Sequence, residues 1–410
     1  MVSTTETDCL AEDYRFQNEL ESILIEQVQA IRPVLRAHAA EGEERGWLAP
    51  ATLEALDGID GIWRMPVPRR VGGLGLSGKS ILRISAELAK GDPAAAWVVQ
   101  IIGGSTWTAS LASDQLQDEI FSDGVPRLCA VFGPPGRAKP VPGGYRVTGR
   151  WPYASGFRHA SWGQWAVMID DGEGPPRPGN FCFIPTSELR LENTWSTVAL
   201  QATGSDTAVA DNVFVPEHRM VLSSMPLGSN DNRARNNGAP SDLWPLTPFV
   251  GRTGIGQAIG IAEAMLEELI ATGMARPIAA TTFARKADSQ VIQRDVGEFA
   301  TRIRTARMLA EQAAGEIDEA ALSRTPLTTA QRAASKAMGA FAMKLLEETS
   351  QGIMLIAGSS AFSRDSVMSR FWRDLAMIAR HVQNSPNLGF ETYGRSLLGV
   401  APNVFPETLI

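Results

Sequence analysis

Only four side chains in this 410-residue sequence titrate near neutral pH in their ordinary state, namely His38, His159, His218 and His381. An unperturbed imidazole has a pKa of about 6.5, so it can accept or donate a proton at working pH. Beside a phenol, whose pKa is about 10, a histidine could hold and partly deprotonate the hydroxyl and make the ring more nucleophilic. The alternative for His381 is an ordinary histidine on a helix surface or at a helix end.

Other catalytic signatures are missing from the sequence. It has no P-loop, no GxSxG elbow, no HExxH motif and no GxGxxG between a strand and a helix. The glycine-rich run 72–75 follows a loop of Pro and Arg, which argues against dinucleotide binding there. Cys9, Cys129 and Cys182 are too widely spaced for a CxxC metal site or a disulfide framework, so no metal is expected.

Charge and composition narrow the class of protein. With 38 Lys and Arg against 45 Asp and Glu, the net charge is −7, which argues against a nucleic-acid binder. The longest nearly unbroken apolar run, 94–102, is far shorter than the roughly 20 residues of a membrane helix. Residues 1–13 lack the basic end and apolar stretch of a secretion signal. We therefore expect a cytoplasmic globular protein without a membrane span.

The length exceeds the roughly 250–300 residues of a single core, so several packed units are expected. Helical spacing of apolar residues predicts an N-terminal α-helical domain over residues 1–125, with a helix restarting at Asp92-Pro93. Short β-rich runs separated by Gly and Pro predict a β domain over 126–222, an antiparallel barrel or sandwich with a hairpin turn at Gly143-Gly144.

The second half of the sequence predicts helices. Residues 223–245 are rich in Ser, Asn, Gly and Pro, and form either a flexible connection or a lid over a pocket. Residues 246–410 predict a C-terminal four-helix bundle. Its two long helices should bury stripes at helical spacing: Val296, Phe299, Ile303, Ala306, Ala310, Ala313 and Ile317 on one, and Ala334, Met338, Phe341, Leu345 and Thr349 on the other.

This order of domains, together with several short motifs, resembles the acyl-CoA dehydrogenase superfamily. The motifs are PRRVGG at 68–73, GRWPYASG at 149–156, ATGSD at 202–206, VPEHR at 215–219, Arg373-Asp374 before His381, and YGR at 393–395. Dehydrogenases of the superfamily commonly place a carboxylate base shortly after the Arg-Asp pair, but the run 371–384 contains no Glu. Because it has a histidine in this stretch, the sequence resembles the flavin-dependent two-component monooxygenases (group D) of the superfamily.

The resemblance implies the oxygenase component of a two-component system. Reduced flavin, FMN first and FAD as an option, would come from a separate NAD(P)H-dependent flavin reductase. Molecular oxygen would form a C4a-hydroperoxyflavin that hydroxylates an aromatic or polycyclic small molecule, in a family that commonly forms homotetramers. The alternatives are an N- or S-oxygenase using the same intermediate, an acyl-CoA dehydrogenase with FAD, and a catalytically silent scaffold.

The resemblance also assigns roles to residues. His381 would orient or activate the substrate, and Ser155 would bind the N5 region of the flavin, with Gly156 and Tyr153 beside it. Arg285 resembles a flavin-contacting arginine supplied across a subunit interface, and Ser359 and Ser360 would hold phosphate at a helix start. The substrate pocket would be lined by Trp107, Phe132, Pro134, His159 and Trp372.

The residues themselves leave plainer alternatives open for these roles. A Ser-Gly pair is an ordinary turn, Arg285 could lie on a solvated face, and the serines could cap a helix. Large aromatic side chains are most often part of the core.

Overall fold

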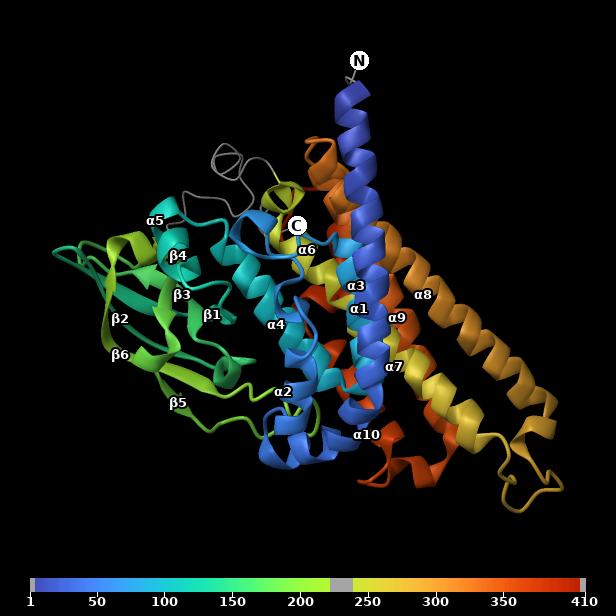
Figure 1. Ribbon diagram of the computed structural model, residues 1–410. Coiled ribbons are helices and arrows are strands. Elements are labelled where there is room, and N and C mark those ends of the chain that lie inside the picture. Colours follow the sequence, from blue (N-terminus) through green and yellow to red (C-terminus); the bar gives the residue numbers. More distant parts are fainter. Residues whose placement is uncertain (1–3, 222–238, 406–410) are drawn as a thin grey trace.

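The computed structural model describes residues 4–221 and 239–405. Most of the expected connection or lid at 223–245 therefore lies outside the described residues; its end forms the short helix η7 (Pro240–Leu243). Helices lie on both sides of this gap in the sequence and pack together, while the β-sheet lies beside them (Figure 1). The expected class, mainly helical with a central β domain, is confirmed.

The N-terminal helices are α1 (Thr4–Arg45), α2 (Pro50–Asp57), α3 (Gly78–Gly91), α4 (Pro93–Ala109) and α5 (Asp114–Phe121). The side chain of Ser77 accepts a hydrogen bond from the Ser80 N–H and so begins α3. Asp92 ends α3 and begins α4, because its carboxylate accepts from the Ala94 N–H and Pro93 suits a first helical turn. This restart places α4 between the sheet and the remaining helices (Figure 1).

The sheet has seven strands in the order β5-β6-β2-β1-β3-β4-β7. They are β1 (Leu128–Val141), β2 (Gly144–Trp151), β3 (Trp162–Ile169), β4 (Arg177–Pro185), β5 (Arg190–Glu192), β6 (Thr207–Pro216) and β7 (Met220–Val221). β1 and β2 form the expected hairpin, with Val141 opposite Gly144. One pair departs from the antiparallel expectation, because β1 runs parallel to β3. The chain can return parallel there since the segment 152–161 crosses over between the two strands.

The C-terminal half is helical. Its main helices are α6 (Leu246–Thr253), α7 (Ile255–Glu268), α8 (Gln290–Leu322), α9 (Thr329–Ala357), α10 (Val367–Ile378) and α11 (Pro386–Leu397). A π-helical turn, η8 (Leu269–Gly273), continues α7, and short 3₁₀ helices are η9 (Lys286–Asp288), η10 (Ser359–Phe362) and η11 (Val382–Asn384).

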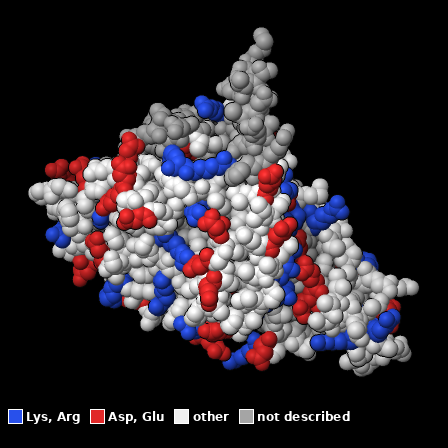
Figure 2. Space-filling view, in the orientation of Figure 1, with Lys and Arg blue, Asp and Glu red and all other residues white. Residues whose placement is uncertain are grey.

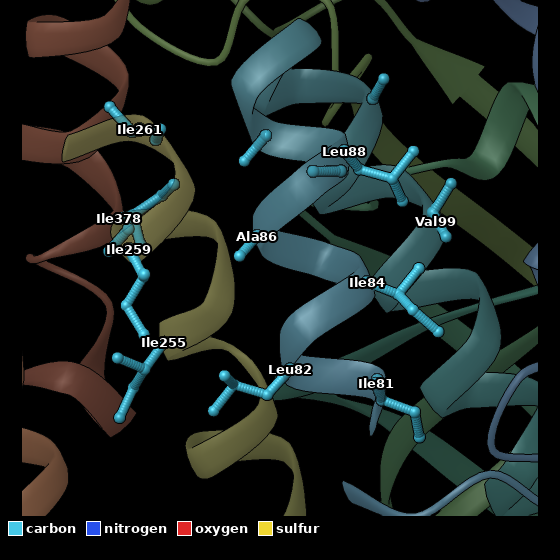
Figure 3. Close-up of a cluster of buried hydrophobic side chains, with 14 of the residues drawn as sticks. Ile81, Leu82, Ile84, Ala86, Leu88, Val99, Ile255, Ile259, Ile261 and Ile378 are labelled. Atoms are coloured by element: carbon cyan, nitrogen blue, oxygen red, sulfur yellow. The ribbon is translucent and has the colours of Figure 1, made fainter. Parts of the chain in front are cut away.

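The core joins the two helical parts. Side chains of α3 and α4 pack there with those of α7 and α10, among them Ile84, Val99, Ile259 and Ile378 (Figure 3). α3 and α7 approach closely at Gly260, where a Cβ would lie 1.9 Å from the Ala86 carbonyl oxygen. Only glycine permits that approach, so the position of α7, and of α10 packed on it, depends on this residue.

The stripe expected to be buried on α9 lies partly on the surface. Phe341 is 43% exposed, whereas Ala340, Met343 and Leu346 are buried. Apolar residues cover more than one face of α9, so spacing alone could not show which face meets the rest of the chain. The stripe on α8 is correct in its central part, where Ile303 and the alanines up to Ile317 are buried.

Over the face drawn in Figure 2, acidic and basic side chains are interspersed. Among the residues that the structure describes, no helix combines the length and the apolar character needed to cross a bilayer. The described part of the chain also contains no group of three or more His, Cys, Asp or Glu side chains placed to hold a metal ion.

Candidate functional site

Ser155 lies in the turn that follows β2, at the junction with α4. The turn is irregular: Tyr153 has a φ of +62° and Gly156 a φ of +76°. It is held to the segment before β6, because the Ala154 N–H donates to the Asp206 carbonyl and the Gly156 N–H donates to the Thr203 carbonyl. Ser155 is buried, whereas the Tyr153 ring is 65% exposed and packs edge-on against Trp195.

Gly156 allows this turn to approach α4. Its positive φ disfavours a side chain, and a Cβ would lie 3.3 Å from Cγ1 of Ile102. We expect Gly156→Ala to lower the free energy of unfolding by ~1–2 kcal/mol, measured by urea denaturation. Gly143→Ala is the control, because Gly143 has a φ of +80° but no atom near a Cβ. A loss in Gly156→Ala no larger than in the control would contradict the importance of the Ile102 contact.

The Ser155 hydroxyl belongs to a row of hydroxyl groups. Its Oγ lies 2.7 Å from Oγ of Ser205, which lies 2.6 Å from Oγ1 of Thr203. The Thr203 hydroxyl donates to the Leu200 carbonyl at 2.8 Å. All three hydroxyl-bearing residues are buried. The row therefore connects the turn after β2 to the chain segment that precedes β6.

Trp97 of α4 connects Ser155 with His381. Its indole N–H donates to the Ser155 Oγ at 3.3 Å, and its ring packs edge-on against the imidazole with 5.6 Å between ring centroids. The two residues expected to be catalytic, Ser155 and His381, thus contact the same tryptophan from different parts of the chain. The structure brings them together around one side chain.

His381 lies between α10 and η11. Its Nδ1 accepts from the Gln383 N–H at 3.4 Å, so the proton of a neutral ring is on Nε2. The imidazole is exposed, yet desolvation by the surrounding protein, followed by the positive charge of Lys336, lowers its pKa. A neutral imidazole with a free Nε2–H can donate a hydrogen bond to a substrate oxygen.

Two buried cations lie behind His381. Lys336 of α9 donates to the Gln383 side-chain oxygen at 3.0 Å and lies 4.2 Å from the Phe405 ring centroid. Burial, followed by the charge of Arg252, lowers the pKa of Lys336 to about 7. Burial also lowers the pKa of Arg252 to about 10. Gln383 therefore connects the Lys336 ammonium to the turn that holds His381.

Asp374 attaches the Leu200 turn to α10. Its buried carboxyl accepts from the Leu200 N–H at 2.6 Å, and the turn places Leu200 at a φ of +49°. Burial raises the pKa of Asp374 to about 8, against the effect of the Leu200 hydrogen bond. Glu43 pairs with Arg373 at 3.1 Å next to this carboxyl. The helix that leads to His381 is therefore tied to the segment that carries Thr203 and Ser205.

The residues of α4 and β1 that were expected to line the pocket, Trp107, Phe132 and Pro134, are not shown in contact with Ser155, Trp97 or His381. Trp107 is fully buried, donates to the Ser241 carbonyl at 2.8 Å and packs against Trp244 and Phe249, so it belongs to the core. Phe132 is 48% exposed, and Pro134 follows it on the surface. The pairing of β1 with β3 shifts between Val131 and Gly136, which moves these residues out of the regular ladder.

His159 follows the Ser155 turn. Burial lowers its pKa to about 4, helped by the charges of Arg127 and Arg158. Its Nε2 is buried and has no hydrogen-bond partner among the described residues. It is neutral at neutral pH and is not shown in contact with Ser155 or His381.

The expected phosphate-binding residues lie at another end of the helical bundle. Arg285 is exposed and paired with Asp288, while Ser359 and Ser360 are exposed in η10. Lys286 joins the two segments by donating to the Ala357 carbonyl at 3.1 Å. Trp372, expected near the substrate, packs instead against Phe362 of η10. The helix start expected at the serines is a single 3₁₀ turn, because α10 begins only at Val367.

A cavity lies apart from all of these residues. It has a volume of about 230 Å³ between α9, α11 and residues 400–405. None of the expected site residues lines it.

Sequence reasoning missed Trp97, Thr203, Ser205 and Asp374 as members of the site. The signal was present for three of them, because Thr203 and Ser205 lie in the ATGSD motif and Asp374 in the Arg-Asp pair. Trp97 carried no such signal, since a tryptophan on an apolar helix face is usually core.

The chain is similar to known flavoproteins over nearly its whole length. Residues 254–386 match the family model "Acyl-CoA dehydrogenase, C-terminal domain". The oxygenase component of the FADH2-dependent resorcinol hydroxylase of Rhizobium sp. is 26% identical, over 92% of this chain and 95% of that protein. The oxygenase subunit HsaA, a flavin-dependent monooxygenase of Mycobacterium tuberculosis, is 28% identical over 94% and 98%. The structure of XiaF from Streptomyces sp. in complex with FADH2 and glycerol has a TM-score of 0.91 and 29% identity, covering 97% of this chain and 99% of XiaF.

These matches and the fold place the chain in the acyl-CoA dehydrogenase-like superfamily, as the motifs predicted. Within it, the chain belongs to the flavin-dependent monooxygenases that act as oxygenase components of two-component systems. It is therefore an enzyme, and its cofactor is a reduced flavin.

Proposed function

We propose that this enzyme uses reduced flavin and molecular oxygen to hydroxylate an aromatic or polycyclic small molecule. The observation that carries the proposal is the contact of Ser155 and His381 with the same tryptophan, Trp97. In this group of three residues, Ser155 would offer its hydroxyl oxygen to the flavin, and His381 would offer its imidazole to the substrate. The reduced flavin would supply the chemistry that activates molecular oxygen, and the protein would hold the flavin and the substrate in place.

The residues around Ser155 fit a flat heterocycle. The Tyr153 and Trp195 rings form an edge-on pair beside the turn, and Gly156 leaves no side chain between the turn and α4. The Ser155 Oγ has two hydrogen-bond partners among the described residues, the Trp97 N–H and the Ser205 hydroxyl, so one of its three hydrogen-bonding positions remains for a ligand. Tyr153, Ser155 and Gly156 would hold the ring system of the flavin.

His381 would hold the substrate. Its neutral Nε2–H donates to a ring hydroxyl and orients the ring carbon that receives the oxygen atom. Removing a proton from a phenol would require the other tautomer, with Nδ1 released from the Gln383 N–H. Orientation is therefore the first role of His381 and proton removal the second.

The names of the relatives support a ring substrate. They include a resorcinol hydroxylase, an indole-3-acetate monooxygenase and a p-hydroxyphenylacetate 3-hydroxylase. The residues argue against an acyl-CoA dehydrogenase, because the only carboxyl of the run 371–384 is Asp374, which is buried and bonded to Leu200. The relatives also include proteins named for FADH2, so FAD is to be tested beside the expected FMN.

A separate NAD(P)H-dependent flavin reductase would supply the reduced flavin, since the relatives are named as oxygenase components. A homotetramer would cover the apolar side chains exposed on the C-terminal helices, among them Phe341 and Leu355, the latter 84% exposed. It would also allow Arg285, Ser359 and Ser360 of one subunit to reach the flavin bound at Ser155 of another. The buried free thiols of Cys129 and Cys182 fit a cytoplasmic location.

The test is a rapid-mixing experiment. The protein is mixed without oxygen with reduced FMN or reduced FAD, then exposed to oxygen while flavin absorbance and released hydrogen peroxide are recorded. We expect a long-lived flavin–oxygen species in the presence of protein and little peroxide. Immediate reoxidation with stoichiometric peroxide would contradict the function. Reduction of a tightly bound oxidised FAD by an acyl thioester would support the dehydrogenase instead.

A further inference from the structure

Lys336 of α9 is a buried cation that forms no ion pair with the described residues. It is 2% exposed, and its ammonium donates to the Gln383 side-chain oxygen at 3.0 Å. The Phe405 ring covers the ammonium, with 4.2 Å between Nζ and the ring centroid. A buried charge without an opposite charge costs free energy, and an apolar side chain would fill this place without that cost. Packing alone therefore does not account for a lysine at this position.

Gln383 contacts both Lys336 and His381. Its side-chain oxygen accepts from the ammonium, and its backbone N–H donates to Nδ1 of the imidazole at 3.4 Å. Nδ1 can accept this bond only while it carries no proton, so the bond is specific for the neutral ring with its proton on Nε2. One residue thus joins the buried cation to the side chain expected to hold the substrate.

The backbone of this turn is held without Lys336. The His381 N–H donates to the Ile378 carbonyl at 3.1 Å, and the Asn384 N–H donates to the His381 carbonyl at 2.8 Å. The Asn384 side chain also donates to the Ile378 carbonyl, at 3.2 Å. Lys336 therefore acts on the Gln383 side chain and on the charge around the imidazole rather than on the path of the chain.

The charged side chains nearest in the sequence and on α4 leave Lys336 as the charge that acts on the imidazole. The helix α4, whose Trp97 packs against the ring, carries no charged side chain. Arg380, next to His381, is paired with Glu347 of α9. Desolvation, followed by the positive charge of Lys336, lowers the pKa of His381.

The helices α6 and α11, which pack against η11, add charges at other places. Arg252 of α6 is buried, and its positive charge acts on Lys336. On α11, Glu391 is exposed and Arg395 donates to the Ala401 carbonyl at 2.7 Å. In the part of the chain that the structure describes, neither helix pairs a carboxylate with the buried ammonium.

We infer that Lys336 is a positioning residue that, through Gln383, keeps the His381 imidazole neutral with its proton on Nε2. The inference rests on the proposed function, because it requires this N–H to hold the substrate. Burial, followed by the charge of Arg252, lowers the pKa of Lys336 to about 7. As the pH falls, Lys336 takes up its proton before the imidazole does, and its charge then opposes a second proton nearby. His381 therefore stays a donor through Nε2 over a wider range of pH.

The test follows the imidazole by NMR in the whole enzyme, without flavin or substrate. With isotopically labelled histidine, the nitrogen chemical shifts report the protonation and the tautomer of each ring, and the His381 signal is the one missing from His381→Ala. We expect the midpoint of its titration to rise by about one pH unit in Lys336→Met, because a nearby like charge is removed. Lys336→Arg keeps the charge and should keep the midpoint.

Two further variants separate charge from packing. Lys344→Met is the control, since Lys344 lies on the same helix but is partly exposed and paired with Glu348, and it should leave the midpoint unchanged. Gln383→Glu keeps an oxygen for Lys336 and the backbone N–H for Nδ1, and adds a negative charge. It should raise the midpoint as Lys336→Met does, with almost no change in side-chain volume.

Product formation should show the same shift. In Lys336→Met, the fall in rate at low pH should begin about one pH unit higher than in the wild type, with more hydrogen peroxide released where the rate has fallen. A merely structural role of Lys336 would lower the rate by the same factor at every pH.

The outcomes separate the inference from the proposed function. An unchanged His381 midpoint in both Lys336→Met and Gln383→Glu overturns the inference. An equal rise in Lys336→Met and Lys336→Arg also overturns it, because the charge would then not be the cause. Both results leave the proposed function standing. A shifted midpoint with an unshifted rate profile overturns the role given to His381 in the proposed function, and the inference with it.

Discussion

His381→Ala is expected to lower the rate of product formation by about 100-fold or more, while the affinity for reduced flavin changes little. The His381 imidazole is the polar group of the site that makes no hydrogen bond with Ser155. Its contact with Trp97 is a packing of the two rings. Its loss removes the donor that orients the substrate but leaves the hydroxyl row intact. Product and hydrogen peroxide should be measured together, because a misoriented substrate diverts oxygen into peroxide.

The pH dependence gives the same residue a second readout. Desolvation and the nearby Lys336 lower the pKa of His381. Protonation of Nδ1 would break the hydrogen bond from the Gln383 N–H that holds the ring, so the wild-type rate should fall only below the usual imidazole pKa of about 6.5. His381→Ala should lack this inflection. Val382→Ala is the control, because Val382 lies in the same turn and is 49% exposed. Turnover in His381→Ala equal to that of the control would remove His381 from the site.

Asp374→Leu is expected to lower the free energy of unfolding by ~2–3 kcal/mol, measured by urea denaturation at pH 7. The substitution leaves the buried Leu200 N–H without an acceptor and removes a polar group beside Glu43 and Arg373. Asp374→Asn keeps an acceptor of the same shape and should lose much less. Equal losses in the two variants would show that the hydrogen bond to Leu200 contributes little.

Asp374→Asn should also change how stability depends on pH. Burial raises the pKa of Asp374 from its ordinary 3.8 to about 8, so between these values the folded protein holds a proton that the unfolded chain has released. Stability contributed by this group is therefore present at low pH and is lost as the pH rises through about 8. Asp92, with a pKa raised by burial to about 6, has the same sign and remains in the variant. The variant should show a shallower decline towards high pH, and an identical slope would contradict the raised pKa.

Much of the fold followed from local signals. Ser77 and Asp92 are side-chain caps, and Asp92-Pro93 marks the boundary between α3 and α4 without any knowledge of the rest of the chain. The parallel pairing of β1 with β3 did not follow, because register depends on distant partners. The same limit explains Phe341, since a helix with apolar residues on two faces does not show which face is covered.

The site was predictable only in part. The motifs predicted roles for Ser155 and His381, and the structure places both side chains against Trp97. Trp97 and Trp107 lie on the same helix, and only their distant partners, Ser155 for one and Ser241 for the other, distinguish a site residue from a core residue. Those partners are 58 and 134 positions away in the sequence, beyond the reach of any local pattern.

The packing of Phe405 over Lys336 has a practical consequence for handling the protein. An affinity tag or fluorescent fusion inserted shortly after Phe405 would lie close to this aromatic ring. Pulling on that ring would disturb the ammonium that Gln383 links to the His381 turn. Fusions are better joined ahead of α1, whose first turns project away from the body of the molecule (Figure 1).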